Sequence, residues 1–149
     1  MIPYILHQIW IGKETIPSAQ KEIMLSNSNI IGKKWVYKLW TNKDLTKKNF
    51  PNTWKYIQKS FCEGNKRGKI WYAQISDLMR YEILYHYGGV YMDATIQMVK
   101  SIDDIITAAN LNKNKMILCN QDQDSDPLQC GYAHVVNGKS VYKRYISNS

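Results

Sequence analysis

The stretch from Ser76 to Thr95, SDLMRYEILYHYGGVYMDAT, constrains the fold of this chain more than any other. Apolar residues recur at helical spacing up to Tyr87, and the pair Gly88-Gly89 predicts the end of that helix. A short apolar strand, Val90 to Met92, follows at once and ends on Asp93. A helix that leads directly into a buried strand is typical of layered α/β domains, whose ligands bind where the strands end.

The rest of the chain repeats this alternation of strands and helices. We expect strands at Tyr4 to Ile11, Trp35 to Trp40 and Met116 to Cys119, with Thr95 to Val99 continuing the strand that precedes Asp93. We expect helices at Ala19 to Ser26, from Asp44, from Pro51 to about Cys62, at Ile70 to Tyr87, at Ile102 to Ala109 and at Tyr142 to Ile146. The pattern predicts one α/β domain over residues 1–149, with a mainly parallel central sheet flanked by helices.

Composition narrows the class of partner without naming it. The net charge of +8 favours anionic partners, and the 5 tryptophans and 11 tyrosines include rings on which sugars or bases stack. The basic residues are dispersed, so the charge is either a solvated surface or a field that attracts anions. A nucleic-acid-binding domain would carry a clustered basic face and a reading motif, and neither is present in the sequence.

Three cysteines without a CxxC spacing predict neither a disulfide framework nor a zinc site. The apolar start of the chain is interrupted by Pro3 and lacks a basic segment, so we interpret it as a first strand rather than a signal peptide. No apolar run reaches the length of a membrane span. The expected location is therefore the cytoplasm, and the oligomeric state is left open.

The acidic and basic residues around the glycine pair are the first candidates for chemistry. Asp77 and Arg80 are three residues apart and share a helix face, either as a surface salt bridge or as a functional pair in a largely buried helix. Asp93 is either a turn residue or a ligand for a divalent metal or a ribose hydroxyl. Asp122, Asp124 and Asp126 alternate, but the glycine and glutamate of a calcium loop do not follow at the required offsets.

The first predicted strand contributes two further candidates. His7 lies in an apolar strand, where a lone histidine is usually a core residue. Trp10 precedes Gly12 closely, and a glycine there is expected to leave an open face for a planar ligand. The sequence contains no P-loop, no GxGxxG and no Gly-x-Ser-x-Gly motif.

Taken together, HQIWIG, the strand ending in LW and SDLMRYEILYHYGGVYMDAT resemble the DXD-containing sugar transferases, a family that includes capsular polysaccharide and outer-chain mannosyltransferases. The resemblance covers roughly residues 2–100. It implies a GT-A fold, which is a Rossmann-like nucleotide-binding variant of the α/β class. It also implies a nucleotide-sugar donor, UDP the favoured carrier, a glycan or protein acceptor, retention of anomeric configuration, and Mn²⁺ or Mg²⁺.

Transferred onto this sequence, the resemblance assigns catalytic roles to Asp77, Arg80 and Asp93, with Asp93 also at the metal. Trp10 is expected to stack on the nucleotide base, and Tyr91 to line the nucleotide site. The full set of predicted donor-binding residues is Ile9, Trp10, Ile11, Gly12, Asp77, Arg80, Gly89, Tyr91, Asp93 and Ala94.

One position departs from the family pattern. Thr95 occupies the place of the second aspartate of the DXD motif, and its neutral hydroxyl is a poorer metal ligand than a carboxylate. The leading hypothesis is a hexosyltransferase, and the alternatives are a nucleotide-sugar-binding module with weak catalysis and, behind it, a nucleic-acid-binding domain.

Overall fold

The computed structural model describes residues 1–12, 14–59, 70–111, 116–118 and 134–136. The expected helix at Tyr142 to Ile146, the alternating aspartates from Asp122 to Asp126 and the three cysteines lie outside the described residues. No helix in the described part of the chain combines the length and apolar character needed to cross a bilayer.

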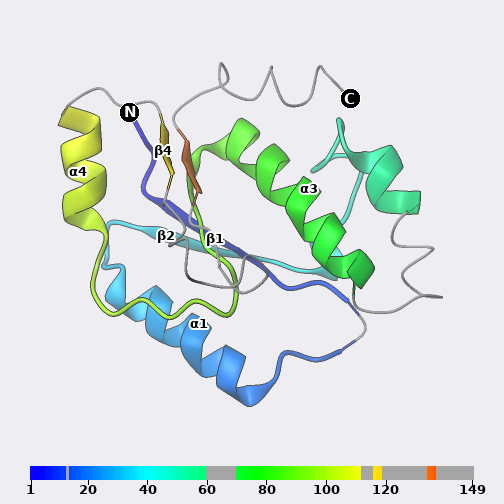
Figure 1. The fold of residues 1–149 in the computed structure, drawn as a ribbon, viewed down its shortest axis with the longest axis horizontal. Helices are drawn as coiled ribbons and strands as arrows, with labels where there is room; N and C mark the ends of the chain where they lie inside the picture. The colour runs from blue at the N-terminus through cyan, green and yellow to red at the C-terminus, as the bar shows by residue number, and fades with distance from the viewer. Residues whose placement is uncertain (13, 60–69, 112–115, 119–133, 137–149) are drawn as a thin grey trace, which may run out of the picture.

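A five-stranded sheet forms the centre of the domain (Figure 1). Its spatial order is β2 (Val36–Trp40), β1 (Ile5–Ile9), β3 (Gly89–Tyr91), β5 (His134–Val136) and β4 (Met116–Leu118). The first three are parallel, with β1 between the others, whereas β5 pairs antiparallel with both β3 and β4. The α/β class with a largely parallel centre is confirmed, and β5 is an additional strand that the sequence did not predict.

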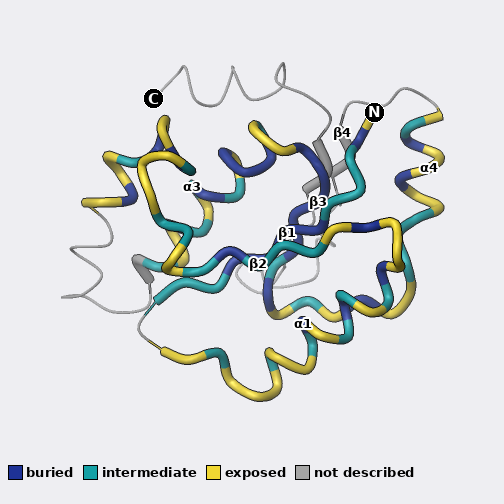
Figure 2. Tube along the Cα trace, turned by 180° about the vertical axis from the view of Figure 1, so that it is seen from behind, coloured by how far each residue is buried: buried dark blue, intermediate teal, exposed yellow. Residues whose placement is uncertain are grey.

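Helices cover both faces of the sheet. The bounds are α1 Ser18–Ile30, the 3-10 helix η1 Asn42–Asp44, α3 Ile70–Tyr87 and α4 Asp103–Leu111, and residues 54–59 are also helical. On one face Met79 and Ile83 of α3 pack against Ile9 and Tyr91. On the other, Leu6 and Val90 pack against Ile106 of α4. Figure 2 shows the burial concentrated along β1, β3 and the inner side of α3.

Two expected elements are wrong. The strand at Thr95 to Val99 is absent, because Asp93 to Ile96 forms a turn in which the Ile96 amide donates to the Asp93 carbonyl at 3.1 Å. No helix starts at Asp44, because its carboxylate accepts from the Thr41 amide at 2.8 Å and from Lys38 at 2.8 Å, closing η1 instead of opening a helix.

The glycine pair both ends α3 and admits β3 to the sheet. Gly88 has φ 63° and donates its amide to Leu84 at 3.0 Å, so it terminates the helix in the left-handed conformation. Gly89 has φ 86°, and a Cβ there would lie 2.5 Å from the Ile5 carbonyl oxygen. The turn from helix to strand therefore requires glycine at both positions.

His7 is a core residue, as predicted. Its ring is buried, with Nδ1 accepting from Trp40 Nε1 at 3.2 Å and Nε2 placed 3.0 Å from the Gly88 carbonyl oxygen. Desolvation by burial lowers the pKa of His7 to about 4, so the ring is neutral at pH 7 and Nε2–H donates to Gly88.

This burial predicts a loss of stability in acid. Between pH 6.5 and about 4 an unfolded histidine takes up a proton while native His7 does not, so stability falls as the pH is lowered through this window. The loss from pH 7 to pH 4.5 is expected to be about 2–3 kcal/mol, at 1.36 kcal/mol per pKa unit. Urea unfolding of the wild type and His7→Gln at both pH values measures it. Identical pH dependence in the two proteins would contradict the assignment.

Glu82 is a fully buried carboxylate on α3 that holds the start of the helical segment 54–59. Oε1 accepts from the amide of Asn52 at 2.8 Å and from its side chain at 2.9 Å. Oε2 accepts from the amide of Thr53 at 3.0 Å and from its hydroxyl. A carboxylate suits this place, because amides at a helix N-terminus carry partial positive charge and otherwise lack partners.

Candidate functional site at the carboxyl ends of the parallel strands

Three segments meet at one edge of the sheet because β2, β1 and β3 are parallel neighbours. They are Thr41-Asn42 after β2, Trp10 to Gly12 after β1, and the segment that begins at Met92 after β3. This edge is where open α/β sheets bind their ligands. The sheet therefore brings Trp10 and Asp93 to the same edge, although they are far apart in the sequence.

Asp77, Arg80, Tyr91 and Asp93, here called the Asp93 cluster, are linked by contacts that centre on Arg80. Arg80 Nη2 forms an ion pair with Asp77 Oδ1 and lies 3.6 Å from Asp93 Oδ1. The Tyr91 hydroxyl donates to Asp93 Oδ1 at 2.6 Å. The Arg80 guanidinium stands over the Tyr91 ring, 4.7 Å from its centroid. The expectation that Asp77 and Arg80 share a helix face is confirmed, and that face is directed toward Asp93.

The cluster is graded from buried to exposed. The Arg80 side chain is 12% exposed, Asp93 26% and Asp77 56%. With two carboxylates around one guanidinium its formal charge is −1. Burial raises the pKa of Tyr91, so its hydroxyl remains protonated and donates to Asp93 at neutral pH.

Arg80 also carries a donor that nothing else in the described structure uses. Its Nε is buried and has no hydrogen-bond partner among the described residues. A buried N–H without a partner costs about 1–3 kcal/mol. The two carboxylates suit the hydroxyl groups of a polyhydroxyl compound next to Asp93, and Arg80 supplies the positive charge of the cluster.

The loop Ile9 to Gly12, here called the Trp10 loop, is fixed by the end of β2. Asn42 Oδ1 accepts from the Gly12 amide at 2.9 Å, and Asn42 Nδ2 donates to the Gly12 carbonyl at 2.6 Å. The Trp10 amide donates to the Trp40 carbonyl at 2.8 Å, and the Trp10 indole donates to the Glu14 backbone carbonyl at 3.3 Å. The loop is therefore held in place, with the Trp10 ring partly exposed.

The expectation of an open face at Gly12 is wrong. A Cβ on Gly12 would lie 3.2 Å from Cδ2 of Tyr72, so the Tyr72 ring already covers the glycine. Gly12 has φ 131° and is needed for the bend that follows β1. Ile9 is buried in the core and Ile11 packs against the same core cluster, so both anchor the Trp10 loop to the core.

The remaining predicted donor residues lie within or beside this edge. Gly89 is buried in β3 against β1, where its conformation has the packing reason given above. Ala94 is buried inside the turn after Asp93, and Thr95 is exposed on that turn. A role in donor binding stays a prediction for all of these positions.

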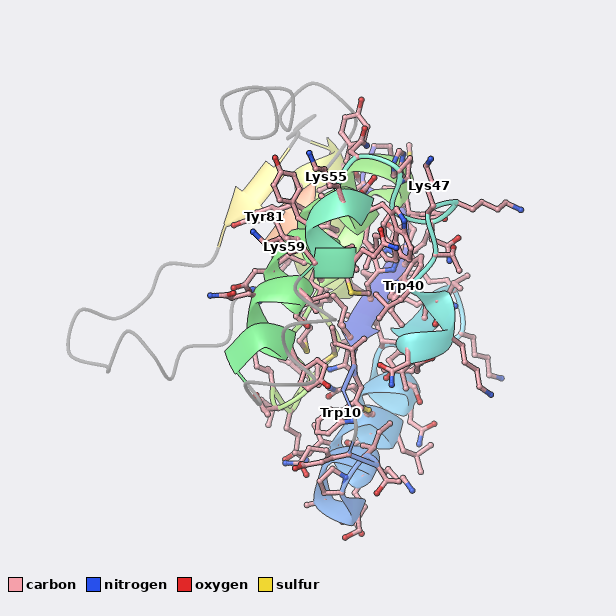
Figure 3. The ribbon with its side chains drawn as sticks, turned by 90° about the vertical axis from the view of Figure 1, so that its right-hand side faces the viewer. Trp10, Trp40, Lys47, Lys55, Lys59 and Tyr81 are labelled. Atoms are coloured by element: carbon pink, nitrogen blue, oxygen red, sulfur yellow. The ribbon has the colours of Figure 1, made fainter. Side chains whose placement is uncertain are left out.

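The basic side chains near the helical segment 54–59 stand apart from the Trp10 loop. In Figure 3, Lys47, Lys55 and Lys59 lie above Trp10, and Trp40 lies at a height between them and Trp10. These lysines therefore do not surround the Trp10 ring. Among the described residues, Arg80 is the cation that forms an ion pair with Asp93.

The described residues fit a weakly held metal better than a tightly held one. They contain no group of three or more His, Cys, Asp or Glu side chains able to enclose an ion. Asp93 Oδ1 already accepts from Tyr91, which leaves Oδ2, and the nearest substitute for a second carboxylate in the motif is the Thr95 hydroxyl. Mg²⁺ and Mn²⁺ tolerate such a set when a diphosphate and water supply the other ligands.

Sequence reasoning did not identify the amide side chains that hold these loops. Gln8 is fully buried in β1 and donates to the Asp93 carbonyl at 3.0 Å. Asn27 is fully buried in α1 and donates to the Ile96 carbonyl at 2.8 Å. The only sequence signal for Gln8 is a polar residue inside an apolar strand.

Comparison with known proteins gives this site a family. Residues 17–112 match the family described as glycosyltransferase sugar-binding region containing DXD motif. A glycosyltransferase of Acanthamoeba polyphaga mimivirus is 35% identical over 112 residues, covering 71% of this chain and 40% of that protein. Inositol phosphoceramide mannosyltransferase 1 of Schizosaccharomyces pombe is 32% identical over 111 residues, covering 72% of this chain and 32% of that protein.

A solved structure supports the fold. The PaToxG glycosyltransferase superposes with a TM-score of 0.66 at 14% sequence identity, over 93% of this chain and 56% of that one. The chain spans a third to two fifths of the length of the two relatives. The GT-A-like fold is thereby confirmed. The residues that match the family, 17–112, include α3, β3 and the whole Asp93 cluster. The chain belongs to the family of glycosyltransferases whose sugar-binding region contains the DXD motif.

Proposed function

We propose that this chain transfers a hexose from a nucleotide-sugar donor, with UDP as the carrier, to a glycan or protein acceptor with retention of configuration. The Asp93 cluster carries the proposal, because it places a largely buried guanidinium and a hydrogen-bonded carboxylate at the strand ends of a glycosyltransferase fold. Family membership favours this function over the nucleic-acid-binding alternative.

Each residue has a distinct part in the proposed reaction. Arg80 stabilises the negative charge that develops on the departing diphosphate, and it is already positioned by stacking on Tyr91. Asp93 accepts hydrogen bonds from the ribose hydroxyls of the donor, and Asp77 accepts from the hydroxyls of the transferred sugar. Trp10 stacks on the nucleotide base. The departing phosphate takes the acceptor proton, so the mechanism needs no strong base from the protein.

A divalent ion has a limited place in this scheme. Asp93, assisted by the Thr95 hydroxyl, would hold Mn²⁺ or Mg²⁺ against the diphosphate, and the ion when bound would neutralise phosphate charge. The second candidate function is donor binding with weak or no transfer. It is favoured because Asp93 is the single carboxylate of the motif, with Thr95 in the place of the second.

A donor panel tests the proposal. Hydrolysis of UDP- and GDP-sugars would be followed with and without Mn²⁺, alongside calorimetry with UDP and Mn²⁺. We expect binding and hydrolysis with at least one UDP-sugar. Binding without hydrolysis or transfer in an acceptor screen would favour the donor-binding module. If no donor binds, both the transferase and the donor-binding module are excluded.

Thr95→Asp is expected to strengthen metal binding in the presence of UDP by about tenfold or more, because it adds a carboxylate two residues from Asp93. Calorimetric titration of Mn²⁺ into the protein with saturating UDP measures the change. Thr95→Asn is the matched control, since it has the same shape without the charge. An unchanged metal affinity in Thr95→Asp would place residue 95 away from the ion.

A further inference from the structure

The turn from Asp93 to Ile96 is bracketed by two buried amide side chains. At its first residue the Asp93 carbonyl accepts from Gln8 Nε2 at 3.0 Å as well as from the Ile96 amide. At its last residue the Ile96 carbonyl accepts from Asn27 Nδ2 at 2.8 Å. Asn27 Oδ1 also accepts from the Met98 amide at 2.7 Å, so the chain beyond the turn is fixed too.

The amides come from two different elements and are themselves held. Gln8 is in β1 and Asn27 in α1, and both are 0% exposed. Gln8 Oε1 accepts from the Tyr37 hydroxyl at 2.9 Å, so the oxygen of the Gln8 amide group has a partner as well as its nitrogen. Burial raises the pKa of Tyr37 to about 12, so this hydroxyl donates throughout the neutral range.

Burying an amide in these positions costs more than burying an apolar residue of similar size unless each polar atom has a partner. All of the hydrogen bonds named here connect the amides to the turn, to Met98 or to Tyr37. The specific gain from these amides is thus the fixed path of the chain on either side of Ala94 and Thr95.

We infer that Gln8 and Asn27 are positioning residues that set the direction of the Asp93 carboxylate and the Thr95 hydroxyl before any ligand arrives. The inference rests on the proposed function. It explains how one carboxylate can serve a diphosphate–metal complex, because a preset carboxylate loses less conformational entropy on binding. Partners of this kind, one step removed from the ligand, typically change affinity or activity 10- to 100-fold when removed.

Gln8→Met and Asn27→Leu test the inference, with Tyr37→Phe as the matched control. Tyr37→Phe removes one hydrogen bond of the same buried network but leaves both amide contacts to the turn. We expect the affinity for UDP with Mn²⁺, measured by calorimetry, to fall about 10- to 100-fold in the first two variants. In Tyr37→Phe the affinity for UDP with Mn²⁺ should fall less than about threefold, although the melting temperature should change by about as much as in the first two variants.

Hydrogen exchange provides a readout that does not depend on activity. In the wild type the amides of Ile96 and Met98 should exchange far more slowly than that of exposed Val99, and this part of the test needs no variant to fold. In Asn27→Leu the Met98 amide should lose its protection. Fast exchange at both amides in the wild type, or an affinity loss in Tyr37→Phe equal to that in Gln8→Met, would overturn the inference.

The two failures are distinguishable. If the wild type binds no nucleotide, the proposed function fails, while the exchange rates still decide whether the two amides hold the turn. If the wild type binds UDP and the amide variants bind it equally well, the proposed function stands and the positioning role is overturned.

Discussion

Asp93→Asn is expected to lower turnover by roughly 100- to 1,000-fold, the range seen when one transition-state contact is removed. The asparagine keeps the size of the side chain and can still accept from the Tyr91 hydroxyl, but it removes the charge that faces Arg80. The loss therefore measures the carboxylate itself. Initial rates of donor hydrolysis at saturating and limiting donor separate the effect on kcat from that on KM.

The matched control is Asp104→Asn, because Asp104 is an exposed carboxylate in the first turn of α4. It should leave turnover unchanged. Tyr91→Phe should give an intermediate loss of about tenfold, since it removes one hydrogen bond to the Asp93 carboxylate and keeps the charge of that carboxylate. Near-normal turnover in Asp93→Asn, with an unchanged melting temperature, would remove Asp93 from the reaction.

Glu82→Ala is expected to reduce the free energy of unfolding by about 3–5 kcal/mol, among the largest effects of a single substitution. It removes the acceptor of the buried Thr53 amide and hydroxyl, and each buried donor left without a partner costs about 1–3 kcal/mol. It also removes a negative charge from the N-terminus of the helical segment 54–59. Urea-induced unfolding followed by far-UV circular dichroism measures the change.

Glu22→Ala provides the comparison, because Glu22 is exposed on α1 and should change stability by less than about 0.5 kcal/mol. Glu82→Gln should lie between the two, since it retains one acceptor oxygen. Equal unfolding midpoints for Glu82→Ala and Glu22→Ala would show that segment 54–59 does not depend on the buried carboxylate.

Much of the site could be predicted because its signals are local in sequence. Helical periodicity, a glycine stop and a strand ending in an acid lie within twenty residues, and they located α3, β3 and Asp93. Asp77 and Arg80 were paired by their spacing alone, and the structure confirms that they touch.

The features that could not be predicted depend on contacts between distant residues. The Asn27 side chain forms hydrogen bonds with the Ile96 carbonyl and the Met98 amide. A strand at residues 95–99 would need these backbone groups to pair with a neighbouring strand, and nothing in the local sequence indicates that Asn27 occupies them. Tyr72 covers Gly12 from a helix about sixty residues later. Strand β5 follows a long polar segment, so its short apolar run has no pattern that sets it apart.

Several successive residues in and after β1 hold neighbouring segments, and this limits where the chain can gain or lose residues. His7 joins Trp40 to Gly88, Gln8 holds Asp93, and Gly12 is clasped by Asn42. Deleting one residue from this segment would turn each later side chain to the opposite face of the sheet and separate it from its partner. Insertions and deletions should therefore be tolerated in the exposed stretch Lys47 to Lys48. They should disrupt the fold between Leu6 and Gly12, where His7 alone contacts both Trp40 at the end of β2 and Gly88 before β3.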